Sequence, residues 1–168
     1  MSIFAYALRG VYKLSGAKKA FTLPEKELQK EIEKQNRHRG VFMPTDHKAC
    51  YETVTIKGFP CLIVRENTKP SKRAILYFFG GGMVIGPDRG DLPVMRKLMR
   101  DTGCDVWFPF YPLCTEHCIT ETYDMVFECY EKGYRLCINH SLIFLWTKQL
   151  QLKCPGRWNF PMRPEPGA

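Results

Sequence analysis

The sequence predicts an α/β fold in which a hairpin precedes parallel strands with flanking helices. Three observations predict it. Two strand-like segments, 51–56 and 61–66, are separated by the turn-forming run Lys-Gly-Phe-Pro. A further segment, 74–79, is apolar on both faces, as in a strand inside a covered sheet, and 104–110 predicts the next strand. A helix-like segment follows each of these, and this alternation is typical of parallel strands joined by crossover helices.

The first forty residues predict two helices. Residues 3–14 have the apolar spacing of an amphipathic helix, which we expect to pack on the domain rather than bind a membrane. Residues 22–40 are mostly charged and predict a surface helix. Thr22 and Glu25 have the spacing of a capping box, and Gly40 follows the predicted end.

The two crossover helices are predicted from their ends and their composition. Asp91 is placed to cap the helix that follows it, and Gly103 is placed to end that helix. The second helix is predicted over residues 120–132. Both helices therefore follow a strand and a loop, as a parallel sheet requires.

The composition changes after Lys132. Sixteen of the 17 acidic residues precede it, and four prolines lie in the last fourteen residues. We therefore expect residues 133–168 to be an atypical, poorly ordered tail. One hypothesis is a truncated or frame-shifted copy of a longer protein, with the sequence beyond Lys132 read out of frame.

The charge, the apolar runs and the cysteine content limit which binding partners and which cellular compartment the sequence predicts. The net charge of +8 suits an anionic partner, but the basic pairs Lys18-Lys19 and Lys72-Arg73 lack interleaved aromatic residues, so we expect no nucleic-acid binding. No apolar run approaches the roughly 20 residues of a membrane span. The eight cysteines include no Cys-x-x-Cys pair, and with no export signal we expect reduced thiols in the cytoplasm.

One group of cysteine and histidine residues resembles part of a metal site but supplies too few ligands. Cys114, His117 and Cys118 lie close together in the sequence, yet they supply only three local ligands and no second cluster pairs with them. We therefore expect no metal ion there. No other motif calls for a cofactor.

Three consecutive glycines, Gly80 to Gly82, follow the apolar segment 74–79. No Gly-Lys-Ser/Thr ends the run, and the spacing Gly-x-Gly-x-x-Gly fails at Ile85, so neither phosphate-binding motif fits. From chemistry alone two interpretations stay open. The glycines form a plain turn with positive φ, or their backbone N–H groups, unshielded by side chains, bind a developing negative oxygen.

Two segments carry a family resemblance. Phe-Phe-Gly-Gly-Gly-Met-Val-Ile-Gly-Pro resembles the His-Gly-Gly-Gly loop after the third strand of hormone-sensitive-lipase-like carboxylesterases, which have the α/β-hydrolase fold. The segment from Asp105 is similar to their fourth strand and the loop behind it, where a Tyr-Pro-Leu-x-x-Glu-His run is typical. The matching residues here are Tyr111, Pro112, Leu113, Glu116 and His117.

The resemblance implies the N-terminal half of such a domain over residues 45–132, with residues 1–40 as cap-like helices. It implies that Gly81 and Gly82 donate N–H groups to an oxyanion and that Gly80 shapes the turn. Tyr111, Pro112, Glu116 and His117 would shape the loop after the fourth strand rather than act as catalytic acid and base. The implied substrate of the parent family is a small-molecule ester. Phe79 replaces the usual His, which leaves the loop without that side chain's hydrogen bonds.

The nucleophile of such an enzyme is missing from the sequence. It would lie in Gly-x-Ser-x-Gly, but none of the four serines, Ser2, Ser15, Ser71 and Ser141, has flanking glycines. His140 and Ser141 are adjacent and would point to opposite faces of a strand. The sheet is therefore predicted to stop before the nucleophile elbow, without a Ser-His-Asp triad and inactive alone. The alternative is a pseudo-enzyme or a protein-interaction module that uses an exposed sheet edge.

The apolar segment 142–146 is a candidate surrogate for the fifth strand of the sheet. Without it, the segment 74–79 would be a bare apolar edge. Such an edge favours self-association through strand pairing.

Overall fold

The computed structural model describes residues 23–133 and, by their backbone alone, residues 134–136 and 142–146. The predicted helix at 3–14, Thr22, His140, Ser141 and the proline-rich end all lie outside this part. The described elements follow one another in the order α3 (Glu25–Asn36), β1 (Cys50–Ile56), β2 (Phe59–Arg65), β3 (Ala74–Phe78), α4 (Asp91–Thr102), β4 (Asp105–Pro109), α5 (Ile119–Leu136) and β5 (Leu142–Trp146).

The strands form one mixed sheet in the order β1-β2-β4-β3-β5. β1 and β2 are antiparallel and make the predicted hairpin, and β2 is also antiparallel to β4. β3 is parallel to both of its neighbours, β4 and β5. The predicted fold class, a hairpin followed by parallel strands with flanking helices, is confirmed.

The hairpin turn has a backbone conformation that the sequence explains. Lys57 and Gly58 have φ angles of 52° and 85°, both positive, as in the two-residue turns that match the twist of a hairpin. Gly58 adopts this conformation without a steric penalty from a Cβ atom. The register then pairs Ile56 with Phe59 across the turn.

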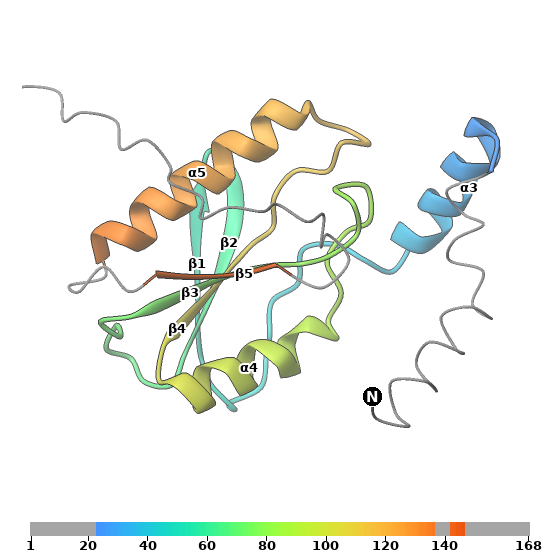
Figure 1. Ribbon diagram of the computed structural model, residues 1–168. Coiled ribbons are helices and arrows are strands. Elements are labelled where there is room, and N and C mark those ends of the chain that lie inside the picture. Colours follow the sequence, from blue (N-terminus) through green and yellow to red (C-terminus); the bar gives the residue numbers. More distant parts are fainter. Residues whose placement is uncertain (1–22, 137–141, 147–168) are drawn as a thin grey trace, which may run out of the picture.

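Helices α4 and α5 cover opposite faces of the sheet (Figure 1). Every residue of β3 and of β4 is buried. α4 packs Met95 and Met99 onto one face, and α5 packs Met125 and Cys129 onto the other. Helices exclude water from both faces of β3 and β4, which explains their apolar residues, while the buried carboxylate of Asp105 in β4 is ion-paired with Arg65.

The ends of all three described helices differ in part from the prediction. α3 begins at Glu25 after Pro24, which makes no side-chain cap, and it ends at Asn36, four residues before Gly40. α4 begins at Asp91 rather than after it, because Gly90 takes the cap position. α5 runs on to Leu136. The predicted end of α4 is confirmed, since Gly103 has a φ of 64° and donates its N–H to Met99.

The segment Leu142–Trp146 occupies the position beside β3. It pairs with β3 in parallel over all five residues, from Ala74 opposite Leu142 to Phe78 opposite Trp146. β3 is therefore flanked on both sides and is not a bare edge. Among the described residues, β5 and β1 form the two edges of the sheet.

Candidate oxyanion site

The three glycines lie at the end of β3, where the parallel strands present their carboxyl ends. Gly80 is two residues beyond the last residue of β3. The loop after β4, which begins at Phe110, leaves the same edge because β3 and β4 are parallel. Ligands of open α/β sheets bind at this edge, so the glycine loop lies where a binding site is expected.

The loop folds into a tight turn closed on Gly81. The carbonyl of Gly81 accepts N–H groups from Val84 at 3.1 Å and from Ile85 at 3.0 Å. The φ angles of Gly81, Gly82 and Met83 are 133°, 62° and 62°. A Cβ on Gly81 would lie 2.4 Å from the carbonyl oxygen of Ile85, whereas one on Gly82 would meet nothing within 4 Å. Gly81 is therefore required by both its backbone conformation and its contact with Ile85.

The N–H groups of Gly80, Gly81 and Gly82 have no acceptor within the part of the chain that the structure describes. Gly82 is exposed, and the other two glycines are half-buried. Unpaired backbone donors next to solvent are available to an external oxygen. An anionic oxygen is the acceptor that gains most from such donors.

Phe79 is fixed by Tyr111 rather than by polar contacts of its own side chain. The two rings stack with centroids 4.0 Å apart and an angle of 1° between their planes. The Tyr111 hydroxyl donates to the Phe79 carbonyl at 2.9 Å, in a buried hydrogen bond. Burial, with smaller effects from Asp91 and Cys114, raises the pKa of Tyr111, so the hydroxyl keeps its proton and remains a donor.

The loop after β4 is hydrogen-bonded to the glycine loop. The N–H of Cys114 donates to the carbonyl of Met83 at 2.8 Å. Within the loop, the carbonyl of Leu113 accepts N–H groups from Glu116 at 3.1 Å and His117 at 2.9 Å. The Pro112 carbonyl accepts a buried hydrogen bond from the Thr122 hydroxyl at 2.7 Å, which anchors the loop to α5.

The side chains of Glu116 and His117 take no part in the glycine loop. Glu116 is exposed. His117 contacts Glu121 through Nδ1 at 2.7 Å and meets the Phe59 ring edge-on. Over the described residues, no three His, Cys, Asp or Glu side chains form a group suited to a metal ion.

A set of contacts from the last residue of α3 and from the segment just after it was missed by the sequence analysis. The Asn36 side chain donates to the carbonyl of Val84 at 2.8 Å and accepts the N–H of Gly86 at 2.9 Å. Arg39 donates to the carbonyl of Gly86 at 3.2 Å and pairs with Asp88 at 3.5 Å. No sequence signal pointed to these contacts, because an Asn at a helix end is equally expected as a plain terminating residue.

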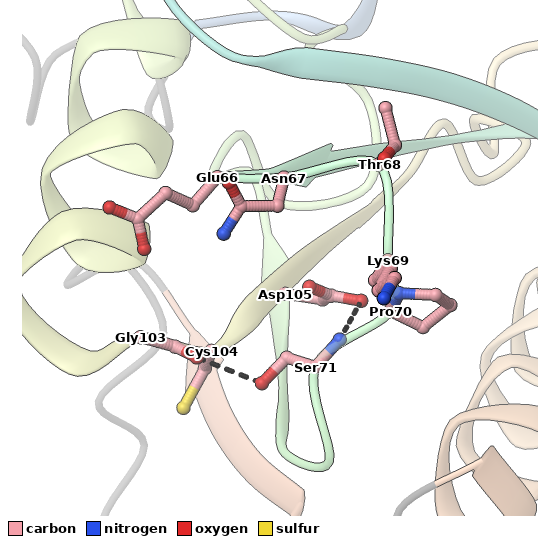
Figure 2. A pocket seen from close by; sticks show the side chains of 9 residues that line it. All are labelled: Glu66, Asn67, Thr68, Lys69, Pro70, Ser71, Gly103, Cys104 and Asp105. Atoms are coloured by element: carbon pink, nitrogen blue, oxygen red, sulfur yellow. Dashed lines mark hydrogen bonds between the residues drawn. The ribbon is translucent and has the colours of Figure 1, made fainter.

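Ser71, the one serine in the described part of the chain, lies at the opposite edge of the sheet. It precedes β3, and its hydroxyl donates to the Gly103 carbonyl at 2.8 Å. It lines a pocket of about 490 Å³ together with residues 66–70 and 103–105 (Figure 2). Asp105 in this pocket already accepts Arg65 Nε at 2.9 Å and the N–H of Ser71 at 3.2 Å. The pocket therefore lies at the amino end of β3 and β4, away from the glycine loop.

No protein-family model and no curated protein sequence matches this chain. Solved structures are similar to it. A Staphylococcus aureus protein assigned as an esterase superposes with a TM-score of 0.63 and 18% identity, over 74% of this chain and 43% of that one. The EstE5–PMSF structure superposes with a TM-score of 0.54 and 20% identity, over 82% of this chain and 47% of that one. A hormone-sensitive lipase from a metagenome library superposes with a TM-score of 0.52 and 20% identity, over 82% of this chain and 46% of that one.

The comparisons define the class of fold. The chain has the fold of the N-terminal portion of α/β-hydrolase esterases, which agrees with the predicted resemblance to the hormone-sensitive-lipase-like group. It spans less than half the length of each of these three proteins. None of the helices in the described segments is both long and apolar enough to span a membrane.

Proposed function

We propose that this chain supplies the oxyanion-binding half of a carboxylic-ester hydrolase. The carrying observation is the loop Gly80–Gly82, whose N–H groups are free of acceptors among the described residues at the carboxyl edge of the parallel strands. In this proposal residues 45–132 form the N-terminal half of the hydrolase domain, and the helices before residue 40 are cap-like.

The chemistry assigned to the loop is stabilisation of charge. Attack on the carbonyl carbon of an ester moves a pair of electrons onto the carbonyl oxygen, which becomes an oxyanion. The N–H groups of Gly81 and Gly82 would donate to that oxygen, with Gly80 shaping the turn. Preorganised donors of this kind lower the barrier because they need little reorganisation when the charge develops.

Hydrolysis needs a nucleophile that these 168 residues do not display in a recognisable form. Gly-x-Ser-x-Gly is absent from the sequence, and the Ser71 hydroxyl is bonded to a backbone carbonyl at the far edge of the sheet. Without the triad, what remains of catalysis comes from electrostatics and binding. We therefore expect the chain to hold an oxyanion and not to turn over esters by itself.

Amide NMR with methylphosphonate tests the oxyanion site, because this probe is small and carries tetrahedral anionic oxygens. We expect shift changes concentrated at the amides of Gly80, Gly81 and Gly82. Sodium chloride at matched ionic strength is the control, since a net charge of +8 attracts any anion weakly. Shifts spread over surface Lys and Arg residues, with none at the glycines, would refute the proposal.

A second candidate function is protein interaction through a sheet edge. The observation that favours it is that β5 pairs only with β3, and β1 only with β2, among the described residues. Such edges present backbone donors and acceptors to another strand. Sedimentation equilibrium tests self-association: a dimer that forms with rising concentration supports it, and a monomer throughout the range contradicts it.

A further inference from the structure

We propose that Asn36 is a positioning residue that holds the glycine turn in its anion-accepting conformation, so that docking of α3 controls the site. The inference rests on the proposed function for its significance, but its structural content is independent of it. Asn36 lies about fifty residues from the loop in sequence and is the last residue of α3.

The side chain of Asn36 contacts the loop backbone through two hydrogen bonds. One carboxamide both donates to the Val84 carbonyl, at 2.8 Å, and accepts the Gly86 N–H, at 2.9 Å. It thereby pairs with the backbone on both sides of Ile85, much as a neighbouring strand would. A planar group with one donor and one acceptor is needed for this, and the Asn side chain supplies both.

Ile85 is joined to the glycine turn through the backbone of Gly81. Ile85 donates its N–H to the Gly81 carbonyl at 3.0 Å, and its own carbonyl oxygen lies 2.4 Å from the place that a Cβ on Gly81 would take. The position of Ile85 is thus tied to the conformation of Gly81, whose φ is 133°. By bracketing Ile85, Asn36 holds the segment that closes the turn.

Helix α3 is attached to the rest of the domain mainly near its C-terminal end. None of its residues is buried, and the helix stands apart from the sheet and from α4 and α5 (Figure 1). Its described ties to the rest of the domain are the polar contacts at its C-terminal end, where Asn36 and Arg39 reach residues 84–88 and Gly40 donates to Pro87 at 3.2 Å. Hydrogen bonds between polar groups near solvent can break and re-form with a small change in free energy, because water replaces the lost partner. The clamp on the loop is therefore separable from the folding of the core.

Site-resolved amide hydrogen exchange in Asn36→Ala tests the inference. We expect the Val84 and Ile85 amides, which do not contact Asn36 themselves through N–H, to exchange about tenfold faster, as for the loss of two hydrogen bonds. The amides of Ile75 and Leu76 in β3 should be unchanged. Gln35→Ala is the matched control, because Gln35 is the exposed neighbour and its side chain, within the described part of the chain, bonds to Glu31 of the same helix.

A second variant separates the two halves of the contact. Asn36→Asp keeps an acceptor for the Gly86 N–H and removes the donor to the Val84 carbonyl. We expect Gly86 to stay protected while Val84 and Ile85 lose protection.

Two results would overturn the inference. Faster exchange at Gly86 alone would mean that Asn36 satisfies one amide and does not hold the turn. An equal rise at the loop and at β3 would mean that it stabilises the whole domain. The experiment contains no anion, so failure of methylphosphonate to bind refutes the proposed function and leaves this result standing.

Discussion

The Tyr111 ring lies flat on the Phe79 ring, 4.0 Å away, and its hydroxyl donates to the carbonyl of that same Phe79. By the sequence resemblance, Phe79 stands where a His-Gly-Gly-Gly loop would have its His. A stacked aromatic pair and one buried hydrogen bond thus fix the residue that enters the glycine loop.

Tyr111→Phe tests the polar half of this arrangement. The ring stack survives, but the buried carbonyl of Phe79 loses its donor, so we expect the free energy of unfolding to fall by about 1–2 kcal/mol. Urea denaturation measures it. Tyr123→Phe is the control, because it removes a hydroxyl from a half-exposed tyrosine on α5. Equal effects in the two variants would show that the Tyr111 hydroxyl has no special role.

The glycines of the loop are predicted to differ in tolerance. Gly81→Ala places a Cβ 2.4 Å from the Ile85 carbonyl oxygen, so we expect a loss of at least about 2 kcal/mol or a rearranged turn. Gly82→Ala meets open space and carries only the strain of a positive φ, about 1 kcal/mol. Urea denaturation and amide shifts of residues 79–86 distinguish them. If the alanine at 82 proves as costly as the one at 81, the described turn is incorrect.

A pH dependence is expected from Asp46. Its pKa is lowered by the Lys48 N–H first, and also by the Tyr51 hydroxyl and by Arg96, which is itself buried. A lowered folded-state pKa means that the ionised form stabilises the fold above the unfolded pKa, about 3.9, and that this contribution is lost as pH falls through the folded value.

Asp46→Asn removes this linkage. The stability difference between wild type and the variant should be constant near neutral pH and shrink below about pH 4. Urea midpoints across the pH range measure it. Asp124→Asn, an exposed carboxylate of α5, is the control for loss of one negative charge. A difference that grows on acidification would contradict the assigned contacts.

A fluorophosphonate probe should not label this chain. No described serine combines a free hydroxyl with a base, and the sequence contains no Gly-x-Ser-x-Gly. The readout is intact mass after incubation, with an active serine esterase as the positive control. A stoichiometric adduct, mapped to any residue, would mean that a working nucleophile exists outside the recognised motif.

The sheet was predictable because its signals are local. Two strand-like segments, each followed by a helix-like segment, and a Lys-Gly turn specify the parallel strands and the hairpin without reference to distant residues. A turn with positive φ at the glycines was predictable for the same reason, and its oxyanion role stays a proposal. Helix ends were less so: Asp91 lies inside α4 because Gly90 already provides the cap position and Asp91 instead accepts the Tyr77 hydroxyl at 3.0 Å.

The supports of the candidate site could not be predicted from the sequence. Tyr111 and Asn36 reach the loop across 32 and about fifty residues, and no local pattern encodes such a contact. The sequence suggested a less rigid loop because Phe79 lacks the hydrogen bonds of His. In the structure, residue 79 is held instead through its backbone carbonyl, which accepts the hydroxyl of Tyr111.

The most direct measurement is the methylphosphonate titration repeated on wild type and on Gly81→Ala, followed at the amide of Gly82. Wild type should show a saturable shift at Gly82 that survives matched salt, and the Gly81→Ala protein should lose it because the turn no longer presents its donors. A wild-type Gly82 amide that ignores the phosphonate, or one that responds equally in both proteins, would contradict an oxyanion role for this loop.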